Sequence, residues 1–120
     1  MQRFLLRAKL HRATITEADL NYEGSLTIDQ QLMEEAGIVP FEQVHVYNIS
    51  NGARFETYAI AGPAGSGVIG LNGAAARKGQ VGDLIIIACY CLLDESELKD
   101  YHPHILLLDE HNSIAQKLSR

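Results

Sequence analysis

The chain has 120 residues, of which 47% are apolar and 21% charged, a balance typical of one soluble globular domain. Its net charge of −5 disfavours a duplex nucleic-acid binder, which needs a basic surface to neutralise phosphates. No apolar run reaches the roughly 18–20 residues that span a bilayer, and the basic first twelve residues lack the apolar core of a signal peptide. We therefore expect a single domain over residues 1–120, in the cytoplasm, that binds neither nucleic acid nor membrane.

The first third of the chain is expected to hold two strands and one short helix. Period-two alternation predicts a long, half-buried strand over residues 3–16, with one side formed by Phe4, Leu6, Ala8 and Leu10. A polar segment with turn residues follows, and residues 26–28 form a short strand. Asp29 is expected to cap a helix that ends near Ala36, with Gly37 as the residue that terminates it.

Two β-type runs, residues 43–50 and 53–60, flank Asn51-Gly52, the strongest short hairpin signal. A two-residue loop would set the register by counting, with these pairs: Ser50–Ala53, Ile49–Arg54 and His45–Tyr58. One face of the second strand would then carry Arg54, Glu56 and Tyr58, and Thr57 would point the other way.

The remainder reads as mostly β. A glycine-rich loop over residues 62–70 precedes a short helix that Asn72 would cap and Gly79 would close. The later elements are expected to be a strand over residues 83–93, a turn or short helix over 94–101, a last strand over 104–109 and an exposed tail from Glu110. About six strands in one small domain suggest a closed barrel.

Three patterns suggest chemistry, and for each the structural interpretation is favoured. Residues 65–70 match GxGxxG, but the long helix and βαβ context of a dinucleotide site are missing. Cys89 and Cys91 could form a zinc site on paper with His102 and His104, although two small residues in an apolar strand are usually just buried. Ser66 lacks the GxSxG context of a hydrolase nucleophile.

Two smaller features are more informative. Residues 13–76 hold eight acidic residues and a single cation, Arg54, which forms either a surface ion pair with Glu56 or a site for an anionic ligand. Gly24-Ser25 is usually a turn, but in a strained peptide the serine hydroxyl can attack the preceding carbonyl. Glycine helps with an unhindered carbonyl and unusual backbone angles.

Several segments, in order along the chain, resemble the bacterial aspartate 1-decarboxylase family. They are Lys9-Leu-His11-Arg-Ala-Thr-Ile-Thr16, Ala18-Asp-Leu20, Tyr22, Gly24-Ser25, Asn51-Gly52, Arg54, Thr57-Tyr58-Ala-Ile60, Asn72-Gly-Ala-Ala-Ala76 and Gly82-Asp83. The YEGS and NGAAA segments together are the most specific part, and little family signal is visible after residue 90.

The resemblance implies a double-psi β-barrel, a homotetramer with active sites between subunits, and conversion of L-aspartate to β-alanine and CO2 for pantothenate synthesis. It also implies a zymogen that cleaves itself between Gly24 and Ser25 into residues 1–24 and 25–120. Attack by Ser25 gives an ester, and elimination and hydrolysis then leave a pyruvoyl group. That group forms a Schiff base with the substrate and replaces pyridoxal phosphate; no metal is implied.

The resemblance also assigns roles to individual residues. Thr57 stabilises the oxyanion during cleavage and contacts substrate, and Tyr58 is the proton donor. Substrate is further held by Arg54, Lys9, Asn72, Gly73, Ala74 and Ala75. Supporting positions are His11, Tyr22 and Tyr47.

Two positions depart from some members of the family: Leu26 replaces a cysteine, and Tyr47 replaces a tryptophan against the substrate. Two alternatives remain open from the sequence, a non-catalytic double-psi barrel that acts as a binding module and a decarboxylase of another acidic amino acid.

Overall fold

The computed structural model describes residues 1–119, and its secondary structure is mainly β. The strands are β1 (Gln2–Thr14), β2 (Glu17–Asp19), β3 (Ser25–Asp29), β4 (Gln43–Asn48), β5 (Arg54–Gly62), β6 (Ile69–Asn72), β7 (Leu84–Asp94), β8 (His104–Leu108) and β9 (Ile114–Ser119). The helices are α1 (Gln30–Ala36) and two 3-10 turns, η1 (Gly73–Lys78) and η2 (Glu95–Glu97). The expected class, a mainly β single domain with few short helices, is confirmed.

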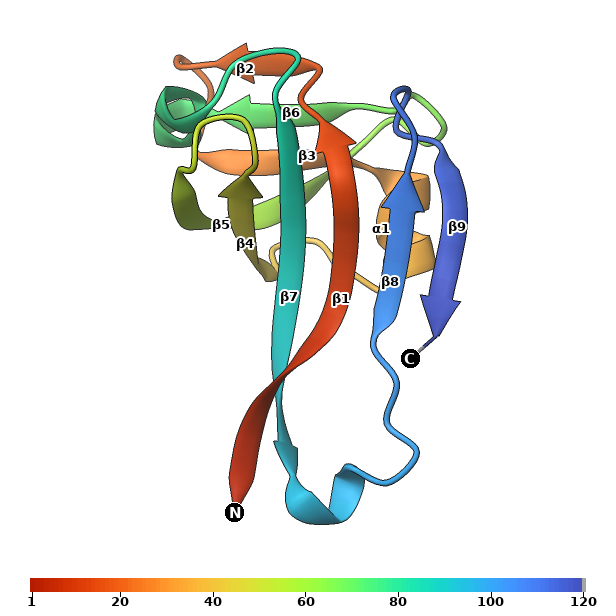
Figure 1. Ribbon diagram of the computed structural model, residues 1–120. Helices are drawn as coiled ribbons and strands as arrows, with labels where there is room; N and C mark the ends of the chain where they lie inside the picture. Colours follow the sequence, from red (N-terminus) through yellow and green to blue (C-terminus); the bar gives the residue numbers. More distant parts are fainter. Residues whose placement is uncertain (120) are drawn as a thin grey trace.

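The strands form one sheet in the order β2-β6-β3-β5-β4-β7-β1-β8-β9. β1 and β7 are a long antiparallel pair that runs the height of the molecule, and their far ends extend as a two-stranded arm (Figure 1). Three pairs are parallel, namely β1 with β8, β2 with β6 and β3 with β5. The hydrogen-bonded order does not close on itself, which does not exclude the barrel that the resemblance implies.

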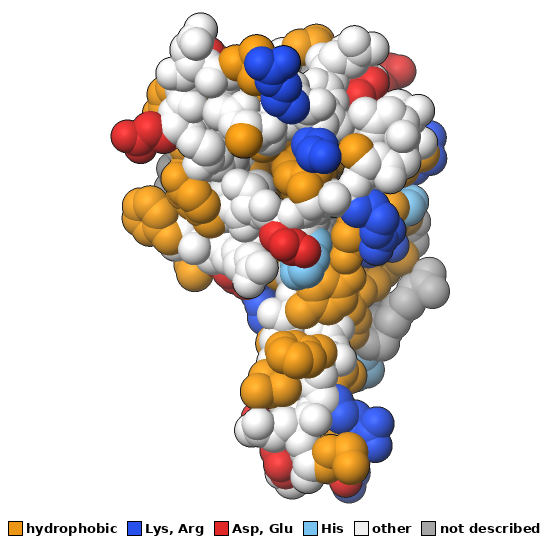
Figure 2. Space-filling view, turned by 90° about the vertical axis from the view of Figure 1, so that its left-hand side faces the viewer, with side chains coloured by type: hydrophobic (Ala, Val, Ile, Leu, Met, Phe, Trp, Pro, Cys, Tyr) orange, Lys and Arg blue, Asp and Glu red, His pale blue; other side chains and the backbone are white. Residues whose placement is uncertain are grey.

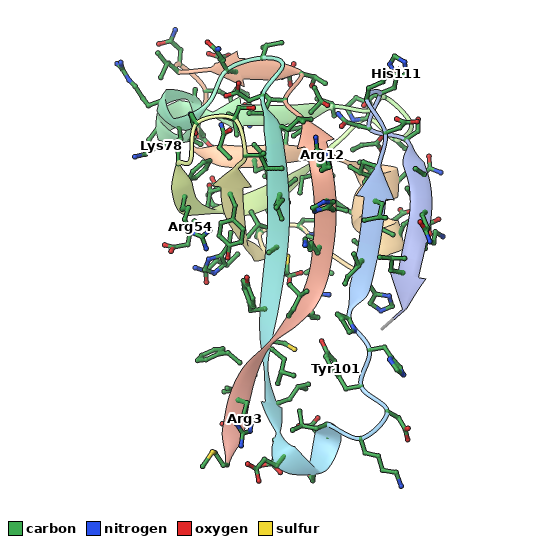
Figure 3. The ribbon with its side chains drawn as sticks, viewed as in Figure 1. Arg3, Arg12, Arg54, Lys78, Tyr101 and His111 are labelled. Atoms are coloured by element: carbon green, nitrogen blue, oxygen red, sulfur yellow. The ribbon has the colours of Figure 1, made fainter. Side chains whose placement is uncertain are left out.

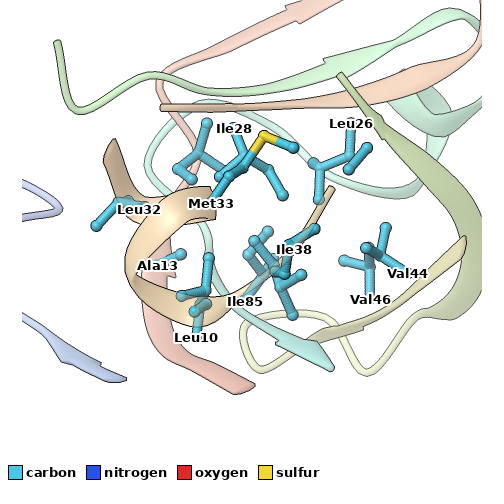
Figure 4. Packing of buried hydrophobic residues seen from close by; sticks show 14 of the residues in the cluster. Leu10, Ala13, Leu26, Ile28, Leu32, Met33, Ile38, Val44, Val46 and Ile85 are labelled. Atoms are coloured by element: carbon cyan, nitrogen blue, oxygen red, sulfur yellow. The ribbon is translucent and has the colours of Figure 1, made fainter. Parts of the chain in front are cut away.

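The buried apolar side chains form a core cluster between the strands and α1 (Figure 4). Its fully buried side chains come from most strands and include Leu10, Leu26, Val46 and Ile85. The helix contributes Leu32 and Met33, and Asp29 caps it as predicted, with its carboxylate accepting from the N–H of Gln31. Gly37 ends the helix at φ +73°, also as predicted.

The alternation predicted for β1 is wrong at its N-terminal end. Register shifts occur at Arg7 and between Leu10 and Ala13, so the side-chain pattern restarts twice. Ala8 and Leu10 face the core, whereas Phe4 is 79% exposed. The bulge turns Arg7 toward the carbonyl of Gly37 and the carboxylate of Glu42.

The predicted hairpin exists, but its register is wrong by two residues. Arg54 pairs with Tyr47 rather than Ile49, His45 pairs with Glu56 rather than Tyr58, and Ser50 and Ala53 lie in a longer loop. Asn48 causes the difference, because its Oδ1 accepts from the N–H groups of Ser50 and Asn51 while its Nδ2 donates to Asp83. A shift of two preserves the faces, so Thr57 still points away from Arg54.

The C-terminal third differs from expectation in two places. The strand over residues 104–108 is followed by another, β9, and the tail from Glu110 is partly buried through Asn112. The Asn112 side chain bonds both the N–H and the carbonyl of Thr14.

Asn72 precedes η1, but its side chain does not cap this helix as predicted, because it donates to Ser25 and Thr27 instead.

Candidate functional site

The Gly24–Ser25 peptide lies just before the point where β3 begins to pair with β5. β3 pairs with β5 in parallel from Leu26 opposite Ala59 to Asp29 opposite Gly62. Continuing this register backward places Ser25 beside Tyr58 and Gly24 beside Thr57. Thr57 and Tyr58 lie in the half of β5 that, among residues 1–119, pairs only with β4. The other edge of this half therefore faces the loop that holds Gly24.

Ser25 is buried, with 1% of its surface exposed, and its hydroxyl is held by Asn72. The Nδ2 group of Asn72 donates to Ser25 Oγ over 2.9 Å and to Thr27 Oγ1 over 2.7 Å. The Ser25 hydroxyl in turn lies 3.4 Å from the carbonyl oxygen of Glu23. Asn72 is the residue opposite Ser25 in the antiparallel β3–β6 pair. Its side chain therefore fixes the serine hydroxyl next to the peptide bond that would be attacked.

Gly73 brings a second backbone against that peptide. It has φ +62°, and a Cβ added there would lie 2.7 Å from Gly24 Cα, 2.8 Å from Gly24 N and 2.9 Å from the carbonyl oxygen of Tyr22. Only glycine permits this approach. The left-handed conformation occurs at Gly73, the residue that faces Gly24, and not at Gly24 itself.

A cavity of about 440 Å³ opens beside Gly24. Thr57 and Tyr58 line it from β5, and Ala74 and Ala75 line it from η1. The structure thus brings seven predicted residues together around one peptide: Gly24, Ser25, Thr57, Tyr58, Gly73, Ala74 and Ala75, with Asn72 beneath them.

Lys78 also lines this cavity, although it is not among the site residues predicted from the sequence. Residues three apart share one face of a 3-10 helix, so Lys78 lies on the same face as Ala75. The 3-10 geometry is the signal that could have identified it.

Four other predicted residues, Arg54, Tyr47, Lys9 and His11, lie on what we call the outer face. This is the side of strands β5, β4, β7 and β1 turned away from the core, and it carries Arg54, Tyr47, His45, Ala88, Tyr90, Lys9 and His11. Figure 3 shows Arg54 at the β4–β5 side of the molecule. Lys9 pairs with Ala88, which pairs with His45, so three inter-strand steps, about 14 Å, separate Lys9 from β5.

Arg54 stacks on Tyr47, with its guanidinium carbon 3.8 Å from the ring centroid. Among the described residues it has no carboxylate within 4.0 Å, and the side chain that approaches the Glu56 carboxylate is His45, at 4.0 Å from Nδ1 to Oε1. The Arg54–Glu56 ion pair considered above is therefore not formed, which leaves the guanidinium edge free to bind an anion.

His11 and Tyr22 contribute differently. Burial lowers the pKa of His11, and the charges of Lys9 and Arg12 lower it further, which favours a neutral ring. Its Nδ1 is buried and lacks a hydrogen-bond partner in the described part of the chain. Tyr22 is exposed and reaches the site through its backbone carbonyl.

The other patterns have structural explanations. The N–H groups of Gly65 and Gly67 donate to the Asp29 carboxylate, which occupies the donors that a phosphate would need. Burial raises the pKa of Cys89 to about 12, and Cys91 Sγ lies 3.6 Å from the Tyr101 hydroxyl. Residues 1–119 contain no group of three or more His, Cys, Asp or Glu side chains arranged to hold a metal.

Within the same residues, no helix has the length and apolar character needed to cross a membrane.

Comparison with known proteins shows to which family the chain belongs. A family model for aspartate decarboxylase matches residues 1–115. An aspartate 1-decarboxylase of Syntrophobacter fumaroxidans is 63% identical over 93% of this chain and 90% of its own length. Those of Desulfotalea psychrophila and Caulobacter vibrioides are 57% and 58% identical over 93% of this chain and 94% and 95% of theirs. The chain therefore belongs to the aspartate decarboxylase family.

Proposed function

We propose that this chain is a self-processing decarboxylase that converts L-aspartate to β-alanine and CO2 for pantothenate synthesis, and that it acts in the cytoplasm. The observation that carries the proposal is the buried Ser25 hydroxyl, held by Asn72 beside a peptide that lines a cavity with Thr57 and Tyr58. Family membership favours this reaction over a non-catalytic barrel or a decarboxylase of another acidic amino acid.

Maturation uses only groups of this chain and water. Ser25 Oγ attacks the carbonyl carbon of Gly24, the amide nitrogen takes the hydroxyl proton, and an ester replaces the amide. Thr57 lines the same cavity as Gly24, and we assign its hydroxyl as the donor for the oxyanion. Elimination releases residues 1–24 with a carboxylate at Gly24, and hydrolysis of residue 25 releases ammonia and leaves a ketone.

The residues present fit a pyruvoyl group at position 25. Cleavage would open residue 25, the first residue of β3, toward the cavity that Gly24 lines, and Asn72 Nδ2 already donates to that residue. The ketone supplies an electrophile for the substrate amine and a sink for the electron pair that CO2 leaves behind. The Tyr58 hydroxyl donates the proton that replaces the lost carboxyl at the α-carbon, while the small side chains of Ala74 and Ala75 leave room for substrate.

We further propose a homotetramer whose sites lie between subunits. Arg54 and Lys9 are the residues expected to hold substrate carboxylates, yet β4 and β7 separate Lys9 from β5, and neither residue lines the Gly24 cavity. One chain cannot bring both side chains to one small dicarboxylate beside Ser25, whereas the outer face of a second copy can supply one of them. Light scattering on the processed protein checks this, and a fully active monomer would contradict it.

Intact-mass spectrometry tests the processing step, and the chain contains its own control. Gly65-Ser66 is a second Gly-Ser pair, but its serine hydroxyl donates to the Pro63 carbonyl, outside the Gly24 cavity. We expect two fragments that meet at Gly24/Ser25, the larger without a free N-terminal amine, and no cleavage at Ser66. Ser25→Ala should remain one chain without aspartate turnover, and Ser66→Ala should process normally. Cleavage of Ser25→Ala at the same bond would refute the mechanism.

A further inference from the structure

Tyr90 has no role in the proposed chemistry, but on the outer face it belongs to the same cluster of side chains as Arg54. Its hydroxyl oxygen lies 2.8 Å from that of Tyr47, and Tyr47 is the ring on which Arg54 stacks. His45 packs its edge against Tyr90, with ring centroids 5.0 Å apart and an interplanar angle of 87°. The three side chains Tyr90, Tyr47 and Arg54 therefore form a continuous chain of contacts from β7 to β5.

The sheet register explains why two distant tyrosines meet. Tyr47 lies opposite Ile86 and His45 opposite Ala88, so Tyr90 is four residues, about 13 Å, along β7 from the Tyr47 row. The intervening outer-face residue of β7 is Ala88, which is buried yet lies outside the main core cluster. Because its side chain is a single methyl group, the two phenol rings can lean toward each other above it.

The cluster is a specific polar contact on an otherwise apolar part of the surface. Figure 2 shows hydrophobic side chains gathered along the narrow arm of β1 and β7, where Phe4 and Leu92 are exposed. Burial raises the pKa of Tyr90 to about 12, and the Tyr47 hydroxyl contributes in the same direction. The Tyr90 phenol is therefore protonated near neutral pH, where its hydroxyl lies within hydrogen-bond distance of the Tyr47 hydroxyl.

We propose that Tyr90 is a positioning residue for substrate: it fixes the Tyr47 ring, and the ring holds the Arg54 guanidinium flat with its N–H edge free. This inference rests on the proposed function of Arg54 as the residue that binds a substrate carboxylate. A planar guanidinium binds a carboxylate through two parallel N–H groups, so its orientation sets affinity. A tyrosine outside the reacting groups would thus determine how tightly aspartate binds and leave the chemical step unchanged.

The test compares fully processed wild type with Tyr90→Phe, Tyr47→Phe and the double variant. Steady-state kinetics with aspartate and calorimetry with succinate are the two measurements. We expect Tyr90→Phe to raise KM and the Kd for succinate about 3- to 10-fold, the value of one lost hydrogen bond, with kcat within about twofold. Tyr47→Phe removes the same bond from the other side, so the double variant should be no weaker than the weaker single variant.

Tyr101→Phe is the matched control. This tyrosine also makes a strong hydrogen bond, from its hydroxyl to the Leu6 carbonyl over 2.7 Å, but it lies in the loop before β8, away from Arg54 (Figure 3). We expect it to lower thermal stability without changing KM or succinate affinity. A merely structural role for Tyr90 would give the same result as this control.

Arg54→Lys separates the two levels of the proposal. If Arg54→Lys loses succinate binding but Tyr90→Phe matches wild type, the positioning role is refuted and the proposed function stands. If Arg54→Lys binds succinate as wild type does, the role of Arg54 fails, and the inference fails with it. Multiplicative effects of the two phenylalanine variants would also overturn it, because they would show that Tyr90 acts independently of Tyr47.

Discussion

Gly73→Ala tests whether the backbone contact at Gly24 positions the bond that is cleaved. The added Cβ would lie 2.7 Å from Gly24 Cα, whereas carbon atoms pack at about 3.5–4.0 Å. The atoms that this Cβ would meet belong to the backbone of Gly24 and Tyr22, and the position of a Cβ is fixed by its own backbone, so neither side can rotate away. The loop that carries Gly24 must therefore retreat by about 1 Å.

A displacement of that size removes the geometry of the attack. The Asn72 Nδ2 to Ser25 Oγ distance of 2.9 Å would grow beyond hydrogen-bond range if the loop carried Ser25 with it. Misplacement of reacting groups by about 1 Å can cost 10²-fold in rate, about 2.7 kcal/mol. We therefore expect self-cleavage of Gly73→Ala to slow by about 10²-fold, followed as the disappearance of intact chain by mass spectrometry.

Gly52→Ala provides the matched control for backbone strain. Gly52 has φ +78°, close to that of Gly73, but a Cβ there meets nothing within 4 Å. In both variants the left-handed alanine destabilises the fold by about 1–3 kcal/mol, and only in Gly73→Ala does the Cβ also collide with the loop that holds Gly24. Gly52→Ala should process at the wild-type rate despite a lower melting temperature. Equal slowing of both variants, or processing of Gly73→Ala within about threefold of wild type, would refute the reasoning.

The other predictions concern Thr57, Tyr58 and Asp29. Thr57→Val should slow cleavage by about 10²–10³-fold because the oxyanion loses its donor, whereas Tyr58→Phe should cleave normally and fail to turn over aspartate; equal loss of cleavage in both would contradict this division of roles. Burial would raise the pKa of Asp29, but N–H donors from Gly67 and Gly65 outweigh it and hold that pKa below its usual value. The stability that the Asp29 carboxylate contributes is therefore present above pH about 4 and lost as pH falls through the lowered pKa, so Asp29→Asn should melt lower at pH 7 and show a shallower acid dependence. Parallel melting curves from pH 7 to pH 3 for the two proteins would contradict that role for Asp29.

Features of the fold were predictable where their hydrogen bonds join residues close together in the sequence. Asp29 caps α1 through the N–H of Gln31, two residues away, and Gly37 ends the helix by adopting the left-handed conformation. Both interactions depend on neighbours in the chain, so residue type and spacing were sufficient to predict them.

Features that depend on distant partners were not predictable in the same way. Asn72 has the sequence position of a helix cap, but its amide bonds Ser25 and Thr27, 47 and 45 residues earlier. Arg7 interrupts the alternation of β1 because it reaches Glu42 and the Gly37 carbonyl. In each case a polar side chain bonds a residue far away in the sequence and not a neighbour in the chain. Nothing in the adjacent residues indicates which of the two kinds of partner it will bond.

The assignment of faces in the site survived an incorrect register for a physical reason. Side chains alternate with a period of two, so the two-residue shift that Asn48 imposes returns every side chain to its own face, whereas a shift of one would have exchanged Thr57 with Arg54. What no local pattern could supply is the parallel pairing of Leu26 with Ala59, since it joins segments separated by a helix and a strand. That pairing sets Gly24 beside Thr57, and only the resemblance to a known family connected the two segments beforehand.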